Sequence, residues 1–418
     1  MFTPDERARL AAEARARLYA RRAALAPARA TAVVAWPPAA SADGRRRVGL
    51  AAPVLSDGGG AETWMYDLVR LTDTARLRWE GLWIENPVPM HPTRRRLEAL
   101  LPIAAGAADE ALRQLARRCD VLVAWALPRL AERIGAPRPP IVMVSHSPPH
   151  SGWAAETYPS WVADFDVAVS EVALGPIPEP RRSRARVIPN AIDPARLRTD
   201  RTRAEVRSAW GIPAEARVLG MLSRATSEKR PEALAATVAH LPQTWWGVGV
   251  GPGWDADSIP RHPRCVYPGP QHDVGAALRA FDALLSPSDY ESFGYTLGEA
   301  LLAGTPVIAT VTGLVLDRPD LVRPIPVAAD GATIAAAVLA DEADAAATAA
   351  RVARAQQYVA TISTPDRFGQ EWTEFLVAVA AATPATPVAN TQPPPPPREV
   401  LTKLKQIKAC PHRRPEPG

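Results

Sequence analysis

The sequence predicts an α/β protein built from two successive Rossmann-like domains. Short apolar runs of strand length alternate with helical stretches, which is typical of a parallel sheet covered by helices on both faces. The alternation restarts near Arg217, after a first series that ends near Arg198. A chain of 418 residues is also too long for a single core of usual size, which favours two domains.

The first series of strands starts at residue 45. Its expected strands are RRRVGLAAPV, WEGLWIE, DVLVAWA, PIVMVSH and FDVAVS, with helices at residues 62–71 and 107–118. The second series has the runs RVLGML, WWGVGVGPG, CVYPG, FDALLSPS and TPVIAT, with helices near residues 229–240, 272–281 and 297–303. With two such sheets in tandem, a ligand is expected in the cleft at the carboxyl ends of the strands.

The two ends of the chain depart from this alternation. Residues 4–26 predict a basic helix, and the Pro-rich stretch near the C-terminus predicts an extended tail without a fixed fold. Between them, RFGQEWTEFLVAVA carries an aromatic stripe at helical spacing, which must pack on a core. The predicted parts are 1–44 (N-terminal basic helix and linker), 45–198 (first domain), 199–382 (second domain with its terminal helix) and 383–418 (tail).

The net charge of +5 is concentrated at the ends of the chain. Residues 1–30 carry seven arginines and three acids, and residues 396–418 carry six basic and two acidic residues, so the rest of the chain is slightly acidic. This distribution does not favour a nucleic-acid partner. The basic ends are either solvated segments or contacts with a partner or anionic lipid headgroups, which would place the protein at the inner membrane face.

Cysteine usage and hydropathy favour a cytoplasmic protein. The three cysteines are far apart, so they predict neither a disulfide framework nor a metal pair. The N-terminus has no apolar core of the kind that directs secretion. No apolar run of about 18 residues predicts a membrane span.

Two loops after predicted strands could bind an anion. In SDGGGAET, Ser56 to Thr63, three glycines allow close backbone approach, and their N–H groups face the next helix. The alternative is a flexible turn, since neither a Walker A nor a GxGxxG pattern is present. In LSRATSEKR, Arg224 and Lys229 would converge on a phosphate-rich ligand, or would be two solvated cations.

The stretch YESFGYTLGEALLAGTPVIAT places two glutamates eight residues apart. Glu291 and Glu299 flank the Phe293-Gly294 step, where a turn can present backbone N–H groups, and carboxylates can accept hydrogen bonds from sugar or ribose hydroxyls. However, Thr296 and Glu299 have the spacing of a capping box, so Glu299 could instead cap its own helix. The residues alone leave both interpretations open.

Taken together, these motifs resemble the retaining glycosyltransferases of family 4, which have the GT-B fold and are also called glycosyl transferases group 1. The stretches GGGAE, VSHS, VIPNAID, LSRATSEKR, GVGVGPG, VYPGP and FDALLSPSDYESFG follow that family's order over roughly Val48 to Ala309. The resemblance implies transfer of a hexosyl unit from a nucleotide diphosphate sugar to a hydroxyl acceptor, such as a glycan or a lipid-linked precursor. It also implies that no cofactor or metal is required.

The resemblance assigns roles to individual residues. Glu299 would hold the ribose hydroxyls, and Glu291 the hydroxyls of the sugar ring. Arg224 and Lys229 would bind the diphosphate and stabilise its charge as it leaves. His146 would lie near the transferred sugar. The other residues that would bind the donor are Phe293, Gly294, Tyr295, Thr296, Gly59 and Gly60.

Some features support other interpretations. His146 could be a structural histidine, or the base of an inverting enzyme. The Asp-x-Asp triplets at 164–166 and 255–257 are interpreted as structural rather than as metal ligands. Ser223 and Ala191 replace glycines usual in the family, and VTGLVLD after Thr310 lacks the usual glutamate. An epimerase of the same fold, or a degenerate module that binds glycans or partners without turnover, therefore remain alternatives.

Overall fold

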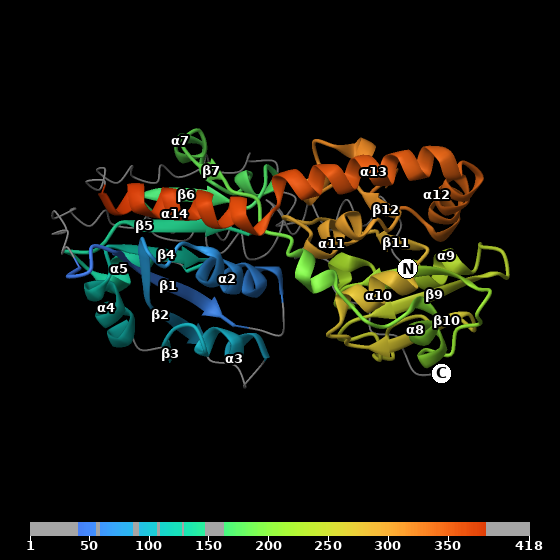
Figure 1. Cartoon of the computed structure of the whole chain (residues 1–418), viewed down its shortest axis with the longest axis horizontal. Helices are drawn as coiled ribbons and strands as arrows, with labels where there is room; N and C mark the ends of the chain where they lie inside the picture. The colour runs from blue at the N-terminus through green and yellow to red at the C-terminus, as the bar shows by residue number, and fades with distance from the viewer. Residues whose placement is uncertain are drawn as a thin grey trace, which may run out of the picture.

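The computed structural model describes residues 41–55, 59–86, 92–106, 109–127, 129–146 and 163–381. The predicted helix at residues 4–26 and the predicted tail at 383–418 lie outside these ranges. Figure 1 shows two lobes side by side, each made of a sheet flanked by helices. The prediction of an α/β fold with two Rossmann-like domains is confirmed.

In the first lobe, the described residues form a seven-stranded sheet with parallel neighbours in the order β3-β2-β1-β4-β5-β6-β7. Its strands are β1 Arg46–Val54, β2 Leu77–Asn86, β3 Ile103–Ala105, β4 Val121–Trp125, β5 Ile141–Ser145, β6 Phe165–Ala168 and β7 Arg186–Val187. Its helices are α2 Gly60–Leu71, α3 Pro92–Glu98, α4 Asp109–Arg118, α5 Leu130–Ile134, α7 Glu179–Arg182 and the short 3-10 helix η2 Val172–Leu174.

In the second lobe, the described residues form a six-stranded parallel sheet in the order β10-β9-β8-β11-β12-β13. Its strands are β8 Arg217–Leu222, β9 Trp245–Val250, β10 Cys265–Gly269, β11 Ala283–Ser286, β12 Val307–Thr310 and β13 Arg323–Ile325. Its helices are α8 Arg203–Ala209, α9 Glu232–Val238, α10 Val274–Ala280, α11 Tyr295–Ala303, α12 Gly331–Ala343 and α13 Ala345–Ile362. Short 3-10 helices are η3 Pro194–Leu197, η4 Ser227–Lys229, η5 Gly313–Val315 and η6 Pro319–Leu321.

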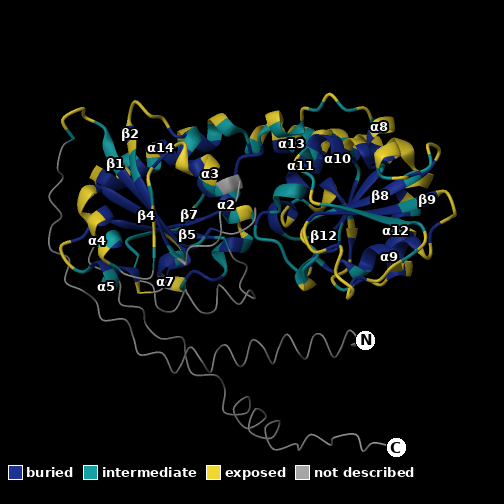
Figure 2. Cartoon of the chain, turned by 90° about the horizontal axis from the view of Figure 1, so that it is seen from below, coloured by how far each residue is buried: buried dark blue, intermediate teal, exposed yellow. Residues whose placement is uncertain are grey.

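The central strands are buried on both faces, as Figure 2 shows for both sheets. Every residue of β4 and β5 is buried. Strands that are covered by helices on both sides need apolar residues at successive positions, because neither face meets water. This is why the continuous apolar runs of the sequence locate the central strands well.

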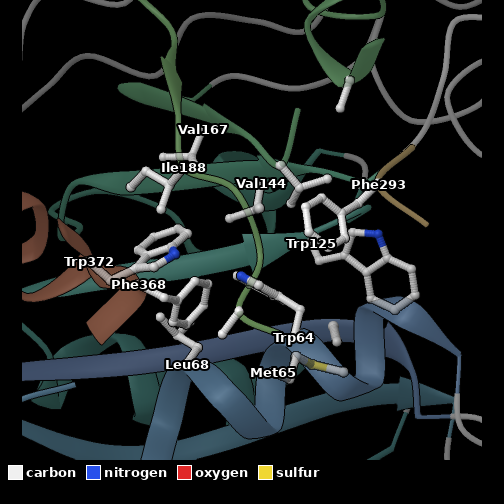
Figure 3. Close-up of a cluster of buried hydrophobic side chains, with 14 of the residues drawn as sticks. Trp64, Met65, Leu68, Trp125, Val144, Val167, Ile188, Phe293, Phe368 and Trp372 are labelled. Atoms are coloured by element: carbon white, nitrogen blue, oxygen red, sulfur yellow. The ribbon is translucent and has the colours of Figure 1, made fainter. Parts of the chain in front are cut away.

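The last helix, α14 Pro365–Ala381, returns to the first lobe. It packs on α2, β1 and β4, and it lies across the left-hand lobe in Figure 1. Gly369 makes the approach to α2 possible, since a Cβ there would lie 2.2 Å from the backbone oxygen of Leu71. The sequence predicts this terminal helix as part of the second domain, whereas its buried stripe completes the core of the first. Figure 3 shows Phe368 and Trp372 in that core, beside Leu68.

Several elements were not expected from the sequence. The strands β3 and β13 have three residues each, and β13 contains a proline. The long helices α12 and α13 are rich in alanine, so they carry little contrast between an apolar and a polar face. Elements of these two kinds give weak periodic signals, since a strand needs length and a helix needs an apolar stripe to be recognised.

Candidate functional site

A cleft of about 670 Å³ lies between the two lobes. It is lined by loops that follow strands of both sheets, as expected for tandem parallel sheets. All the site residues predicted from the sequence line this one cleft, although they come from distant parts of the chain. They are Gly59, Gly60, His146, Arg224, Lys229, Glu291, Phe293, Gly294, Tyr295, Thr296 and Glu299.

Lys229 and Glu291 form an ion pair in the cleft. The Lys229 Nζ lies 2.6 Å from the Glu291 Oε1, and both side chains are mostly buried. The Ser288 hydroxyl donates to the same carboxylate oxygen over 2.9 Å. The family resemblance implies that the two charges bind different parts of one ligand. In the structure they neutralise each other, so a diphosphate would have to share Lys229 with Glu291.

Arg224 lies exposed beyond the end of β8, at the cleft. Within the described part of the chain, no hydrogen bond or ion pair engages its guanidinium. A planar guanidinium can bind two phosphate oxygens at once. Arg224 is therefore the cation of this loop that is ready to receive an anion without first giving up a partner.

Glu299 does not cap its helix. Helix α11 has Gly294 as its N-cap residue, with a φ of 87°, so Thr296 lies inside the first turn rather than at the cap. The Glu299 side chain is buried at the cleft, and its Oε1 lies 3.1 Å from the Arg196 guanidinium. Burial raises the pKa of Glu299, the Arg196 charge lowers it, and the Asp67 charge raises it further. The capping-box interpretation is thus wrong.

A cluster of charges around Glu299 was missed from the sequence. Arg70 lies 3.0 Å from Asp67 and 2.6 Å from Asp193, and Arg196 lies one turn after Asp193. Burial raises the pKa of Asp67 to about 6, although Arg70 opposes this change. The signal in the sequence was slight: one acid and one base three residues apart on α2, and another such pair in NAIDPARL. The cluster joins α2, the segment between the lobes and α11.

His146 follows β5 and is half-buried at the cleft, while the Nε2 atom of its ring is enclosed. Its ring centroid lies 4.5 Å from that of Trp64 and 6.0 Å from that of Trp125. Burial lowers the pKa of His146 to about 3, so the ring is neutral at physiological pH. Its Nε2 has no hydrogen-bond partner among the described residues. The Nε2 of a neutral imidazole can donate or accept one hydrogen bond with a ligand, depending on the tautomer, but the ring cannot supply positive charge.

The predicted glycine loop is only partly described, since residues 56–58 lie outside the described ranges. Gly59 is the N-cap residue of α2, and Gly60 begins that helix. A Cβ at Gly60 would lie 3.3 Å from the Tyr295 ring of the other lobe, so the glycine lets the lobes approach each other. The Tyr295 hydroxyl is buried and lacks a partner among the described residues.

The described residues contain no group of three or more His, Cys, Asp or Glu side chains that could hold a metal ion. The two aspartates of the DFD triplet pair with arginines, in agreement with the prediction that this triplet is structural. Asp164 lies 2.5 Å from Arg138, and Asp166 pairs with Arg181. Of the helices in the described ranges, none is both long and apolar enough to span a membrane.

Residues of the second lobe match a known protein family, and parts of the chain match several curated enzymes. Residues 216–357 match the family described as glycosyl transferases group 1. The 2-deoxystreptamine glucosyltransferase of Streptomyces kanamyceticus is 33% identical over 159 residues, or 35% of this chain and 41% of that enzyme. The D-inositol 3-phosphate glycosyltransferase of Corynebacterium jeikeium is 34% identical over 149 residues, or 31% and 36% of the two chains. The matched part thus spans about two fifths of these curated relatives.

Solved structures extend the likeness to both lobes. Anabaena HepE in complex with UDP and glucose has a TM-score of 0.67 and 18% identity, with 80% of this chain and 100% of HepE covered. A glycosyltransferase from Rickettsia africae has a TM-score of 0.63 and 14% identity, with 81% and 100% covered. At such identities the likeness concerns the fold, which is the two-domain GT-B arrangement.

Proposed function

Because residues 216–357 match the glycosyl transferases group 1 and both lobes together have the GT-B fold, we propose that this chain is a hexosyltransferase. It moves a hexosyl unit from a nucleoside diphosphate sugar to a hydroxyl acceptor, which is a glycan or a lipid-linked precursor. The observation that carries this proposal is the cleft, which is lined by Lys229, by the buried Glu299 carboxylate and by the Arg224 guanidinium, for which the described residues supply no partner. These are the groups that a diphosphate and a ribose need.

The cations and the carboxylates of the cleft bind different parts of the donor. Arg224 and Lys229 bind the diphosphate, and Glu299 accepts hydrogen bonds from the ribose hydroxyls. Glu291 faces the hydroxyls of the sugar ring, and backbone N–H groups near Gly294 and Gly60 add neutral donors. This assignment needs no metal ion, since two side-chain cations already face the anion.

In the reaction, the bond between the anomeric carbon and the diphosphate oxygen breaks, and its electron pair leaves with the diphosphate. Preorganised cations stabilise that developing charge, which lowers the barrier. The acceptor oxygen bonds to the anomeric carbon from the same face, with retention of configuration, and its proton passes to the departing phosphate. His146 is neutral beside the sugar and offers one hydrogen bond, while Trp64 and Trp125 pack against its ring and hold it in place.

A thermal-shift titration with UDP-glucose, GDP-mannose and ADP-glucose tests the donor site. UDP-glucose comes first, because HepE has been solved with UDP-glucose. A donor at about 100 times its dissociation constant should stabilise the protein by about 2.7 kcal/mol. Arg224→Ala and Glu299→Gln should each weaken binding about tenfold or more, because each loses a charge-assisted hydrogen bond. Arg117→Ala, on α4 and highly exposed, is the control.

Failure of all three donors to stabilise the wild type would sink the donor-site assignment. Release of nucleoside diphosphate that depends on an added acceptor supports transfer. Release by water that no added acceptor accelerates indicates hydrolysis or epimerisation, and binding without release indicates a module without turnover.

We also infer contact between the basic ends of the chain and an anionic membrane surface. The support is the charge of residues 1–30 and 396–418, which lie outside the described ranges. Sedimentation with vesicles that contain or lack phosphatidylglycerol tests this, and equal sedimentation with both would count against it.

A further inference from the structure

A single serine joins the donor-side loop to the opposite lobe. Ser292 follows Glu291, and its hydroxyl donates a hydrogen bond of 2.5 Å to the backbone oxygen of His146. In return, the Ser170 hydroxyl donates to the backbone oxygen of Ser292. Ser292 therefore uses both its side chain and its main chain to contact the first lobe.

The topology of the first sheet places the two contact points together. The strands β5 and β6 are parallel neighbours, with Ser145 opposite Ala168, so the residues that follow them leave the sheet at the same edge. His146 comes directly after Ser145, and Ser170 comes two residues after Ala168. The Ser170 side chain is buried and also accepts from the Ala173 N–H over 3.3 Å, which orients its hydroxyl.

The loop that carries Ser292 is firmly attached to its own lobe. The Glu291 N–H donates to the Thr312 hydroxyl over 3.1 Å, and the Leu314 N–H donates to the Phe293 oxygen over 2.9 Å. Gly313 allows this approach, because a Cβ there would lie 2.5 Å from the Phe293 oxygen. A displacement of Ser292 is consequently passed to Glu291 rather than absorbed by the loop.

Phe293 adds an apolar contact beside the hydrogen bonds of Ser292 with the first lobe. Its ring is buried, and Figure 3 shows it beside Trp125 of the first lobe. Each of these two side chains, which face the transferred sugar in the proposed function, is also held within its own lobe: His146 between Trp64 and Trp125, and Glu291 by Lys229 and Ser288. The distance between His146 and Glu291 is thus governed by how the two lobes meet, and the meeting point next to both residues is Ser292.

We propose that Ser292 is a positioning residue, which fixes Glu291 relative to His146 when the cleft closes on the donor. The proposal rests on the proposed function and adds a residue to it. Ser292 binds neither phosphate nor ribose in this assignment. Its loss should therefore change the rate of the chemical step more than the affinity for the nucleotide, because misplacement of reacting groups lowers kcat.

The kinetic test compares Ser292→Ala, Ser292→Thr and the exposed control Ser208→Ala. Release of UDP from UDP-glucose by water gives kcat and KM without a known acceptor, and titration with UDP gives the dissociation constant. Ser292→Ala should lower kcat about five- to tenfold, as expected for one lost hydrogen bond, with the UDP affinity unchanged within about twofold. Ser292→Thr keeps the hydroxyl and should recover most of the rate, and Ser208→Ala should match the wild type.

Two results would overturn the positioning role. One is an unchanged kcat in Ser292→Ala. The other is a loss of UDP affinity as large as the loss of kcat, which would show that Ser292 only maintains the donor site. If the wild type binds none of UDP, GDP and ADP, the proposed function fails, and that outcome is distinct from either result.

A structural measurement decides the matter if water does not release UDP at a measurable rate. Small-angle X-ray scattering of the ligand-free protein reports on how the lobes meet. The double variant Ser170→Ala/Ser292→Ala removes both hydroxyl donors, so its radius of gyration should exceed that of the wild type and of Ser208→Ala. An unchanged radius of gyration would show that the two serines do not hold the lobes together, and the proposal would fall.

Discussion

The imidazole of His146 lies against the Trp64 ring, with 4.5 Å between the ring centroids, and burial alone accounts for its low pKa. A buried imidazole resists protonation because the cation would lose its hydration without gaining a counter-charge. The residue thus supplies shape and one hydrogen bond rather than charge. It follows that an acid limb of activity near pH 6.5 would have to come from a group other than His146.

The same burial makes folding stability depend on pH. The folded pKa of His146 is about 3, and the unfolded chain has the ordinary value of about 6.5. Between these values only the unfolded chain binds the proton, so the stabilisation is complete above pH 6.5 and is lost as the pH falls towards 3. Urea unfolding at pH 7 and pH 5 should show the wild type losing about 2 kcal/mol relative to His146→Gln. Equal losses in both proteins would contradict the buried neutral state.

Glu299 shows what the sequence could and could not establish at this scale. Its position in the motif predicted a ligand contact, and its spacing from Thr296 predicted a cap. The choice between a ligand contact and a cap depends on where α11 begins. Helix α11 begins directly after Gly294, whose backbone lies in the left-handed region. Arg196 as its partner was beyond reach, because a contact across 103 residues leaves no local pattern.

Among the elements, α14 and α2 are held together by one close contact. Gly369 packs directly on the end of α2, where a Cβ would lie 2.2 Å from the Leu71 backbone oxygen. The neighbouring hydroxyl of Thr373 donates to the Gly369 oxygen and accepts from the Asp73 N–H over 2.9 Å. Because the contact joins the backbone of Gly369 to the backbone of Leu71, an added methyl group can be accommodated only by moving a helix.

Gly369→Ala should therefore destabilise the protein, although alanine is the better helix former. Overpacking of this kind costs about 1–3 kcal/mol, which exceeds the gain of about 1 kcal/mol in helix propensity. Gln370→Ala, at the next and exposed position of the same helix, is the matched control. Urea unfolding monitored by tryptophan fluorescence measures both variants. A stabilised Gly369→Ala would show that the two helices are not tightly packed at this point.

At the level of elements, the sequence located the strands better than the helices of the second lobe. Central strands such as β4 and β5 are uninterrupted apolar runs, since both faces are covered. Helix α13 covers 18 residues but is alanine-rich, and only a few of its side chains are buried. The helical period was therefore faint, and the helix went unrecognised.

Over the described residues, the chain crosses between the two lobes twice. It passes from the first lobe to the second near η3, and it returns through Ser363, whose backbone oxygen accepts from the Ile192 N–H over 2.7 Å. The aromatic stripe of α14 predicted that this helix packs on something, but it did not say on what. Periodicity identifies a buried face, whereas its partner depends on contacts between residues about 300 positions apart, such as Asp73 with Thr373.

Because α14 returns to the first lobe, removal of this helix should affect the first lobe and not the second. A chain that ends at residue 363 lacks Phe368, Trp372 and Leu376, which are almost completely buried in the first lobe. Burial of each such side chain contributes about 1.5–3 kcal/mol, so their combined loss is comparable with the stability of a whole domain. The first lobe should therefore unfold, while the second lobe keeps its core. A chain that ends at residue 382 retains α14 and is the control.

Hydrogen exchange followed by mass spectrometry can tell the two lobes apart. In the shorter chain, peptides from β1 and β4 should lose protection, whereas peptides from β8 and β11 should keep it. The terminal helix was first assigned to the second domain, and that assignment predicts the reverse pattern, with loss in β8 and β11. Because the two arrangements differ in which sheet becomes exposed to water, the location of the lost protection decides between them in a single comparison with the chain that ends at residue 382.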